Sequence, residues 1–149
     1  MARVAVVTGG TRGIGEAISV ALKAAGYKVA ANYAGNDEAA AAFTKETGIA
    51  TYKWDVSNYD ACVDGIAKVE AAHGPVDVLV NNAGITRDTL LLRMSEAHWD
   101  DVMNTNLRSA FLTCKAAIRT MLRQKVGHII NIGSVVGDMG NASQANYAA

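Results

Sequence analysis

The fold is decided by one stretch near the N-terminus, Val4-Ala5-Val6-Val7-Thr8-Gly9-Gly10-Thr11-Arg12-Gly13-Ile14-Gly15. Four consecutive aliphatic residues are typical of a parallel strand that is covered on both faces. The glycines indicate a tight turn that opens a helix, where free backbone N–H groups and the helix dipole bind phosphate. The spacing of Gly9, Gly13 and Gly15 departs from the G-x-G-x-x-G fingerprint, so an ordinary βα turn remains an alternative.

Outward from this stretch, short apolar runs alternate with helical patterns. Predicted strands cover residues 4–7, 28–33, 50–54, 76–80 and 128–132. Predicted helices cover residues 13–25, 38–46, 58–72 and a long segment within 95–124, with Gly26 as a stop and with Ser57 and Ser95 as caps. Strands that alternate with helices form βαβ units and a parallel sheet. The predicted fold class is therefore α/β, a doubly wound parallel sheet in one domain over residues 1–149, with strand order 3-2-1-4-5.

The long helix carries most of its apolar residues at three- and four-residue spacing, which predicts one buried stripe. The stripe consists of Trp99, Val102, Met103, Asn106, Ala110, Phe111, Cys114, Ala117, Ile118, Met121 and Leu122. A buried amide must be hydrogen-bonded, so a purely structural role for Asn106 is an alternative to a functional one.

Composition and charge exclude several classes of protein. The 149 residues are 50% hydrophobic and 19% charged, with 14 Lys and Arg against 14 Asp and Glu. This balance argues against a nucleic-acid partner, and no apolar run reaches the roughly 18 residues of a membrane span. Cys62 and Cys114 form no CxxC pair, which favours a reducing, cytoplasmic location. The three histidines lack metal-ligand spacing, so we expect no metal site.

Three further segments follow later strands of the predicted sheet. Asn81-Asn82-Ala83-Gly84 follows the fourth strand, Ser134 follows the fifth, and Asn146-Tyr147 comes soon afterwards. Together with the glycine turn, in this order and spacing, they resemble the short-chain dehydrogenase/reductase family over essentially the whole chain. The resemblance implies a Rossmann fold and an oxidoreductase that uses a nicotinamide dinucleotide.

The resemblance also implies roles for individual residues. The cofactor contacts would be Gly9, Thr11, Arg12, Gly13, Ile14, Gly15, Asp55, Val56, Asn82, Ala83 and Gly84. Ser134 would hold the substrate carbonyl, Tyr147 would donate a proton to its oxygen, and Asn106 would organise a water chain. These residue types suit ketone reduction, because negative charge grows on the oxygen as hydride reaches the carbon and must meet hydrogen-bond donors.

The end of the sequence departs from the family pattern. The family carries a lysine four positions after the tyrosine, and its charge lowers the pKa of the phenol. Here Ala148 and Ala149 end the sequence before that position. We therefore expect a chain that lacks the C-terminal part of the family fold and is inactive, or nearly so, as it stands. A non-catalytic module that binds the dinucleotide remains an alternative.

The expected cofactor is NADPH rather than NADH. NAD-specific relatives place an acidic residue directly after the second strand, where it binds the ribose 2′-hydroxyl. This sequence has Asn32-Tyr33-Ala34 there, and the nearest acid is Asp37. Arg12 in the glycine turn can instead pair with a 2′-phosphate, unless it is a solvated loop charge.

The substrate class is implied by resemblance alone. Residues 82–88 resemble both the acetoacetyl-CoA reductases of polyhydroxyalkanoate synthesis and the 3-oxoacyl-acyl-carrier-protein reductases of fatty-acid synthesis. Residues 33–39 and 52–56 favour the CoA enzyme, whereas residues 90–94, 132–137 and 144–147 favour the carrier-protein enzyme. Acetoacetyl-CoA is the expected substrate, with Asp88, Asn141 and Gln144 where CoA-using relatives contact it. Full-length members of the family commonly form homotetramers through the long helix.

Overall fold

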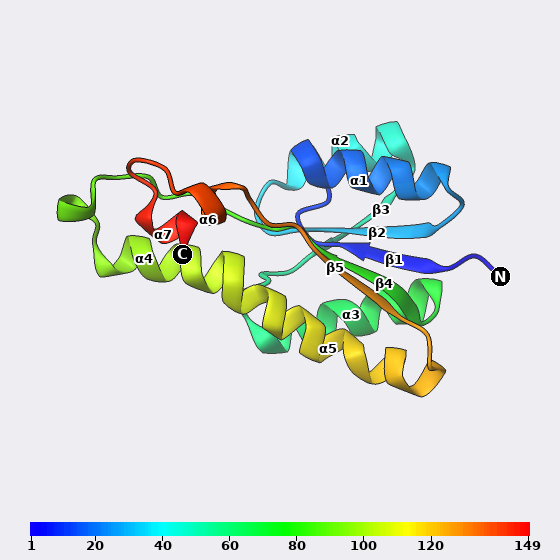
Figure 1. Ribbon diagram of the computed structural model, residues 1–149. Coiled ribbons are helices and arrows are strands. Elements are labelled where there is room, and N and C mark those ends of the chain that lie inside the picture. The colour runs from blue at the N-terminus through cyan, green and yellow to red at the C-terminus, as the bar shows by residue number, and fades with distance from the viewer.

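The computed structural model describes all 149 residues and contains one five-stranded parallel sheet (Figure 1). Its strands are β1 (Val4–Val7), β2 (Lys28–Tyr33), β3 (Ala50–Lys53), β4 (Val76–Asn81) and β5 (His128–Asn131), in the spatial order β3-β2-β1-β4-β5. Its helices are α1 (Gly13–Ala24), α2 (Asp37–Thr47), α3 (Tyr59–His73), α4 (Glu96–Val102), α5 (Ser109–Gln124), α6 (Val136–Met139) and α7 (Ala145–Ala148). A 3-10 turn covers Leu91–Arg93, and a π-helical segment, Met103–Arg108, joins α4 to α5. The doubly wound α/β fold and the strand order predicted from the sequence are confirmed.

Helices cover the sheet on both faces, with α1 and α2 on one side and α3 and α5 on the other (Figure 1). Successive side chains of a strand point to opposite faces, so β1 supplies both layers. Val4 and Val6 join the cluster under α3 and α5, whereas Ala5 and Val7 join the cluster under α1 and α2. All four are at most 2% exposed, which makes β1 the centre of the fold.

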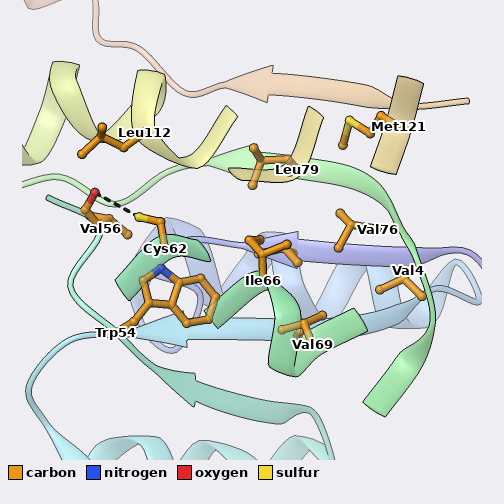
Figure 2. Packing of buried hydrophobic residues seen from close by; sticks show 13 residues of the cluster. Val4, Trp54, Val56, Cys62, Ile66, Val69, Val76, Leu79, Leu112 and Met121 are labelled. Carbon is orange, nitrogen blue, oxygen red and sulfur yellow. Dashed lines mark hydrogen bonds between the residues drawn. The ribbon is translucent and has the colours of Figure 1, made fainter. Parts of the chain in front are cut away.

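The larger cluster lies between the sheet and helices α3 and α5 (Figure 2). Its members from α3 include Cys62 and Ile66, and Trp54 lies beside them just after β3. A methyl group added to Gly65 would come within 2.4 Å of the Trp54 ring, so a glycine is required where α3 meets the indole. This contact fixes the chain that leaves β3 toward the carboxyl edge of the sheet.

Helix α3 begins at Tyr59 and is capped by Asn58, not by the predicted Ser57. Asn58 Oδ1 accepts the backbone N–H of Ala61 at 2.9 Å, as an N-cap does. The Ser57 hydroxyl donates to Asp55 Oδ1 at 2.7 Å instead. The predicted Ser57 cap is therefore wrong by one residue, because two adjacent residues were both good caps and only the backbone path separates them.

The predicted buried stripe on the long helix is wrong in part. Trp99, Phe111, Ile118 and Leu122 are between 40% and 69% exposed. Apolar residues occupy a wider arc of this helix than α3 and the sheet cover. The residues of this helix that do enter the core are Val102, Leu112, Ala117 and Met121. None of the helices combines the length and apolar character that crossing a bilayer requires.

Candidate active site

Two cavities adjoin at the carboxyl ends of the strands, where doubly wound folds bind their ligands. The first, the glycine-loop cavity, has a volume of about 830 Å³. It is lined by every residue that was predicted to contact the cofactor, namely Gly9, Thr11, Arg12, Gly13, Ile14, Gly15, Asp55, Val56, Asn82, Ala83 and Gly84. The second, the serine–tyrosine cavity, measures about 650 Å³ and is lined by Asn106, Ser134 and Tyr147. Both cavities share Asn82, Ala83 and Gly84 as a common wall.

Glycines shape the loop between β1 and α1. Gly15 faces the Gly9 carbonyl so closely that a methyl group added to it would lie 2.0 Å from that oxygen. Gly9 and Gly13 have φ values of 61° and 55°, in the left-handed region that favours glycine. Nothing lies within 4 Å of a methyl group added to Gly13, so the loop is open there.

The N-terminus of α1 is left without a side-chain cap. Asn36, Asn58 and Ser95 each cap a later helix by accepting a backbone N–H. Arg12 occupies the equivalent position of α1, in an extended conformation, and makes no capping hydrogen bond. The first N–H groups of α1 therefore stay free at a wall of the glycine-loop cavity, where an anion can accept from them.

Thr8, the first residue after β1, joins the glycine loop to the segment after β4. Its hydroxyl oxygen accepts the N–H groups of Asn82 and Ala83, both at 3.0 Å, while the hydroxyl donates to the Val80 carbonyl at 3.4 Å. The Asn82 amide in turn donates to the carbonyls of Thr8 and Gly9, at 3.1 and 3.3 Å. This reciprocal network fixes the common wall of the two cavities.

Asn32 at the end of β2 braces the same edge from the other side. It is 2% exposed, and its Oδ1 accepts the Gly9 N–H at 3.3 Å while its Nδ2 donates to the Trp54 carbonyl at 2.9 Å. The side chain is therefore committed to the backbone of its neighbours. The end of β2 therefore offers an amide, and no carboxylate, to a ligand in the glycine-loop cavity.

The nearest acid, Asp37, is already paired. The Lys53 ammonium lies 3.0 Å from its Oδ1, and the Tyr33 hydroxyl donates to the same oxygen at 3.0 Å. The hydrogen bonds from Lys53 and then Tyr33 lower the pKa of Asp37, and the bond to Asp37 raises the pKa of Tyr33. Lys53 offsets the negative charge of Asp37 near the glycine-loop cavity.

Asp55 and Val56 line the far end of the glycine-loop cavity. Asp55 Oδ1 accepts the Ser57 N–H at 2.8 Å and the Ser57 hydroxyl at 2.7 Å. No protein group donates to Oδ2, so this oxygen can still accept a hydrogen bond. The exposed carboxylate is thus oriented by Ser57 with one acceptor to spare.

Asn106 lies in the π-helical segment. It makes the hydrogen bonds that a structural role requires, which was the alternative to a functional role. Its Oδ1 accepts the N–H of Ile85 at 2.8 Å, and its Nδ2 donates to the Ile85 carbonyl at 2.9 Å. These bonds satisfy the amide and hold the loop after Gly84 against the helix. Asn106 also lines the serine–tyrosine cavity, and its functional role stays a prediction.

Two short helices that pack against each other, α6 and α7, lie beside the serine–tyrosine cavity (Figure 1). Tyr147 reaches the cavity from α7, and Ser134 reaches it from the segment between β5 and α6. Ser134 follows β5 and is exposed, and its Oγ accepts the Val136 N–H at 3.2 Å. Tyr147 is half-buried in α7. The two hydroxyl groups therefore border one cavity together with the wall that it shares with the glycine loop.

The three predicted substrate contacts form a chain beside this cavity without lining it. Asn141 Nδ2 donates to Gln144 Oε1 at 2.8 Å, and Gln144 Nε2 donates to Asp88 Oδ1 at 3.1 Å. All three lie at least partly exposed. The structure brings them together, although 56 residues separate Asp88 from Gln144.

With this geometry in hand, comparison with known proteins decides the family. A family model described as short chain dehydrogenase matches residues 3–149. The chain belongs to the short-chain dehydrogenase family. Acetoacetyl-CoA reductases of Shinella zoogloeoides and Rhizobium meliloti are each 60% identical to it over 149 residues. A 3-oxoacyl-[acyl-carrier-protein] reductase FabG of Staphylococcus aureus is 48% identical over 154 residues.

These alignments cover this short-chain dehydrogenase chain completely but not its relatives. The chain spans 62% of the length of the two acetoacetyl-CoA reductases and 63% of the Staphylococcus protein. The family membership confirms the resemblance read from the glycine turn, the Asn-Asn-Ala-Gly segment, the serine and the tyrosine. It makes the chain part of an oxidoreductase family.

Sequence reasoning missed three residues of this short-chain dehydrogenase site. Thr8 could have been found, because it is a polar residue at the end of β1 beside the exit of β4. Arg87 lines both cavities and lies 3.5 Å from Asp101, an ion pair that no local pattern announces. Asn146 contacts backbone atoms up to 59 residues away, which its place beside Tyr147 did not suggest.

Proposed function

We propose that these residues belong to a cytoplasmic, NADPH-dependent reductase that converts a 3-oxoacyl thioester, acetoacetyl-CoA first, to the 3-hydroxyacyl thioester. One observation carries the proposal. Residues suited to hold a dinucleotide and hydroxyl groups suited to polarise a carbonyl lie on two sides of one wall, formed by Asn82, Ala83 and Gly84. The names of the relatives at 60% identity support the thioester.

The chain's own residues fit a dinucleotide. The uncapped start of α1 and the open space at Gly13 suit a pyrophosphate, which needs N–H donors and close backbone approach. Asp55 and Val56 would hold the adenine, and the unpaired Oδ2 of Asp55 is an acceptor for an amino group. Thr11, Ile14 and the common wall would line the rest of the cofactor.

Three features favour NADPH over NADH. Arg12 lies at the mouth of α1 and forms no ion pair, so its guanidinium is available for a 2′-phosphate. Asn32 stands where NAD-specific relatives have an acid, and its side chain is used to brace the sheet. Lys53 compensates the charge of Asp37, which would otherwise repel a phosphate.

When bound, the reduced nicotinamide supplies the hydride that forms the new C–H bond. The Tyr147 hydroxyl donates its proton to the ketone oxygen as charge grows there, forming the O–H bond and leaving a phenolate. The Ser134 hydroxyl donates a hydrogen bond to the same oxygen and stabilises the developing alkoxide. Asn106 is a positioning residue, which holds Ile85 at the wall of the cavity and contributes to the water chain of the family pattern.

The acyl chain of the substrate would be carried either by CoA or by an acyl-carrier protein. Asp88, Asn141 and Gln144 would contact the substrate through the hydrogen-bonded chain they already form. An acyl-carrier protein is the second candidate carrier, favoured by the 48% identity to the Staphylococcus reductase. We place CoA first because identity is higher among acetoacetyl-CoA reductases, at 60%.

A homotetramer is part of the same proposal. Phe111, Ile118 and Leu122 leave a row of apolar side chains exposed on α5, between 41% and 69% of their surface. Exposed apolar rows of this kind suit contact with a second copy of the chain. The row supports assembly through the long helix.

The test measures NADPH oxidation with acetoacetyl-CoA and with an acetoacetyl-acyl-carrier protein. It is run on this chain and on residues 1–149 continued by the C-terminal segment of the Shinella relative. We expect turnover in the continued form and a higher kcat/KM with the CoA ester. If both forms bind NADPH but neither thioester is reduced, the assignment of a 3-oxoacyl thioester as substrate is wrong. A higher kcat/KM with the acyl-carrier protein would make that carrier, and not CoA, the first candidate.

A further inference from the structure

Asn146 is a buried amide beside the active site, and it bonds to backbone groups of three different segments. It is 1% exposed, although it belongs to a short helix beside the open serine–tyrosine cavity. Its Nδ2 donates to the carbonyls of Arg87 and His98, both at 3.1 Å, and its Oδ1 accepts the Tyr147 N–H at 2.8 Å. Both amide hydrogens and the oxygen are satisfied, which is what burial of such a group requires.

The three partners lie on three elements that no other single side chain joins. Arg87 belongs to the loop between β4 and α4, His98 to the first turn of α4, and Tyr147 to α7. Two neighbouring contacts run parallel to the Arg87 bond. The Thr89 N–H donates to the Ser143 carbonyl at 2.9 Å, and the Gln144 amide donates to Asp88 at 3.1 Å.

The turn before α7 is built around these contacts. Ser143 has φ 65°, in the left-handed region that residues with a side chain rarely adopt. Helix α7 has only four residues, and Gln144 at its start makes no capping hydrogen bond. Asn146 therefore supplies the acceptor that the helix start lacks, and it does so for the N–H of Tyr147 itself.

We infer that Asn146 is the positioning residue for Tyr147, tying this acid to the loop that carries Arg87 and Asp88. The inference rests on the proposed function and deepens it. A proton donor must meet the reacting oxygen at hydrogen-bond distance, and a displacement of about 1 Å can lower a rate about 100-fold. Asn146 anchors the Tyr147 backbone to the loop that carries Arg87 and Asp88. The phenol and this loop therefore move together.

The first arm tests the tether in the 149-residue chain. Amide hydrogen exchange is followed at Tyr147 in the wild type, in Asn146→Ala and in Asn146→Asp. The aspartate keeps the acceptor for the Tyr147 N–H but removes both donors. We expect protection in the wild type, loss of it in Asn146→Ala and retention in Asn146→Asp. Equal protection in all three forms would overturn the tether.

The second arm tests its consequence in residues 1–149 continued by the C-terminal segment of the Shinella relative. We expect Asn146→Ala to lower kcat about 100-fold, to raise the solvent deuterium isotope effect on kcat and to leave the Kd for NADPH unchanged. The isotope effect rises because proton transfer from a misplaced Tyr147 becomes slower than the other steps. Asn146→Asp leaves the Arg87 and His98 carbonyls without their donor. Its kcat and isotope effect should lie between those of the wild type and those of Asn146→Ala.

A matched control separates positioning from stability. Val69→Ala removes buried surface from α3, where the residue is 0% exposed, and should lower Tm without changing the isotope effect. Wild-type kcat and isotope effect in both Asn146 variants would overturn the inference, as would loss of the folded state in both by circular dichroism. If the continued wild-type form binds NADPH but reduces no thioester, the proposed function is wrong. The amide hydrogen exchange at Tyr147 would then be the measurement that tests the role of Asn146.

Discussion

Asn106 and Ile85 form a closed pair of hydrogen bonds, in which one side-chain amide satisfies both the N–H and the C=O of one distant peptide unit. The two residues are 21 positions apart, one in the π-helical segment and one in the loop after β4. The π-helical turn adds a residue to the helix, and the Ser109 N–H accordingly bonds the Asn104 carbonyl five residues earlier. The irregular turn and the loop are therefore held as one unit.

Asn106→Ala should destabilise this unit. Both groups of Ile85 would lose their partner in a half-buried site, which costs about 1–3 kcal/mol of unfolding free energy. Urea unfolding measures the free energy of unfolding, and NADPH oxidation by the continued form measures kcat. We expect both quantities to be lower in Asn106→Ala than in the wild type. Asn104→Ala is the matched control, because its side chain makes no hydrogen bond and lies in the same segment. Equal stability of the two variants would contradict the prediction.

Gly15→Ala should abolish dinucleotide binding. The added methyl group would lie 2.0 Å from the Gly9 carbonyl oxygen and 2.6 Å from Asn82 Nδ2, so the loop must move. We expect a loss of about 1–3 kcal/mol in stability and no NADPH fluorescence change on titration. Gly35→Ala, with nothing within 4 Å of the new methyl group, should leave Tm unchanged. Wild-type NADPH affinity in Gly15→Ala would show that the loop does not bind the pyrophosphate.

Arg12→Ala should change cofactor preference rather than cofactor binding as such. A charge-assisted hydrogen bond to phosphate is worth about 1.5–3 kcal/mol, so the Kd for NADPH should rise about 10- to 100-fold. The Kd for NADH, which lacks the 2′-phosphate, should stay the same. Lys68→Ala, an exposed cation on α3, controls for net charge. A parallel loss of affinity for both cofactors would place Arg12 on the pyrophosphate instead.

The two cysteines should react very differently. Burial, and to a lesser extent the charge of Asp55, raises the pKa of the Cys62 thiol to about 11. At pH 8 only about one thousandth of it is thiolate, so iodoacetamide should label the half-buried Cys114 and spare Cys62, as mass spectrometry would show. In urea both should be labelled equally.

Since the folded-state pKa exceeds the 9.0 of a free thiol, this group's stabilising contribution is full below pH 9.0 and is lost as pH rises toward 11.

The sheet was predictable because its strands are short apolar runs and the first three are each followed directly by a helix of 11 to 15 residues. Right-handed crossovers then leave few possible strand orders. The cofactor wall was predictable for the same reason, since the residues that follow β1 and β4 meet at one edge whenever those strands are neighbours. Gly9 and Asn82 needed no more than the strand order to be placed together.

Contacts between a side chain and a distant backbone were not predictable. Asn146 and Thr8 bond peptide groups 59 and 74 residues away, and any residue type can supply a peptide group, so no pattern marks the partner. The exposed Phe111 and Leu122 illustrate a second limit. Helical periodicity reports which residues share a face, but it does not report how much of that face its neighbours cover.

The position of β1 between β2 and β4 has a consequence for synthesis on the ribosome. β2 follows β1 closely in the chain, but Thr8 finds its partner Val80 only 72 residues later. A nascent chain that ends before β4 therefore carries the most apolar strand of the protein with one edge unpaired. Such an edge is a target for chaperones and for premature association, until the segment that completes the wall of the active site leaves the exit tunnel.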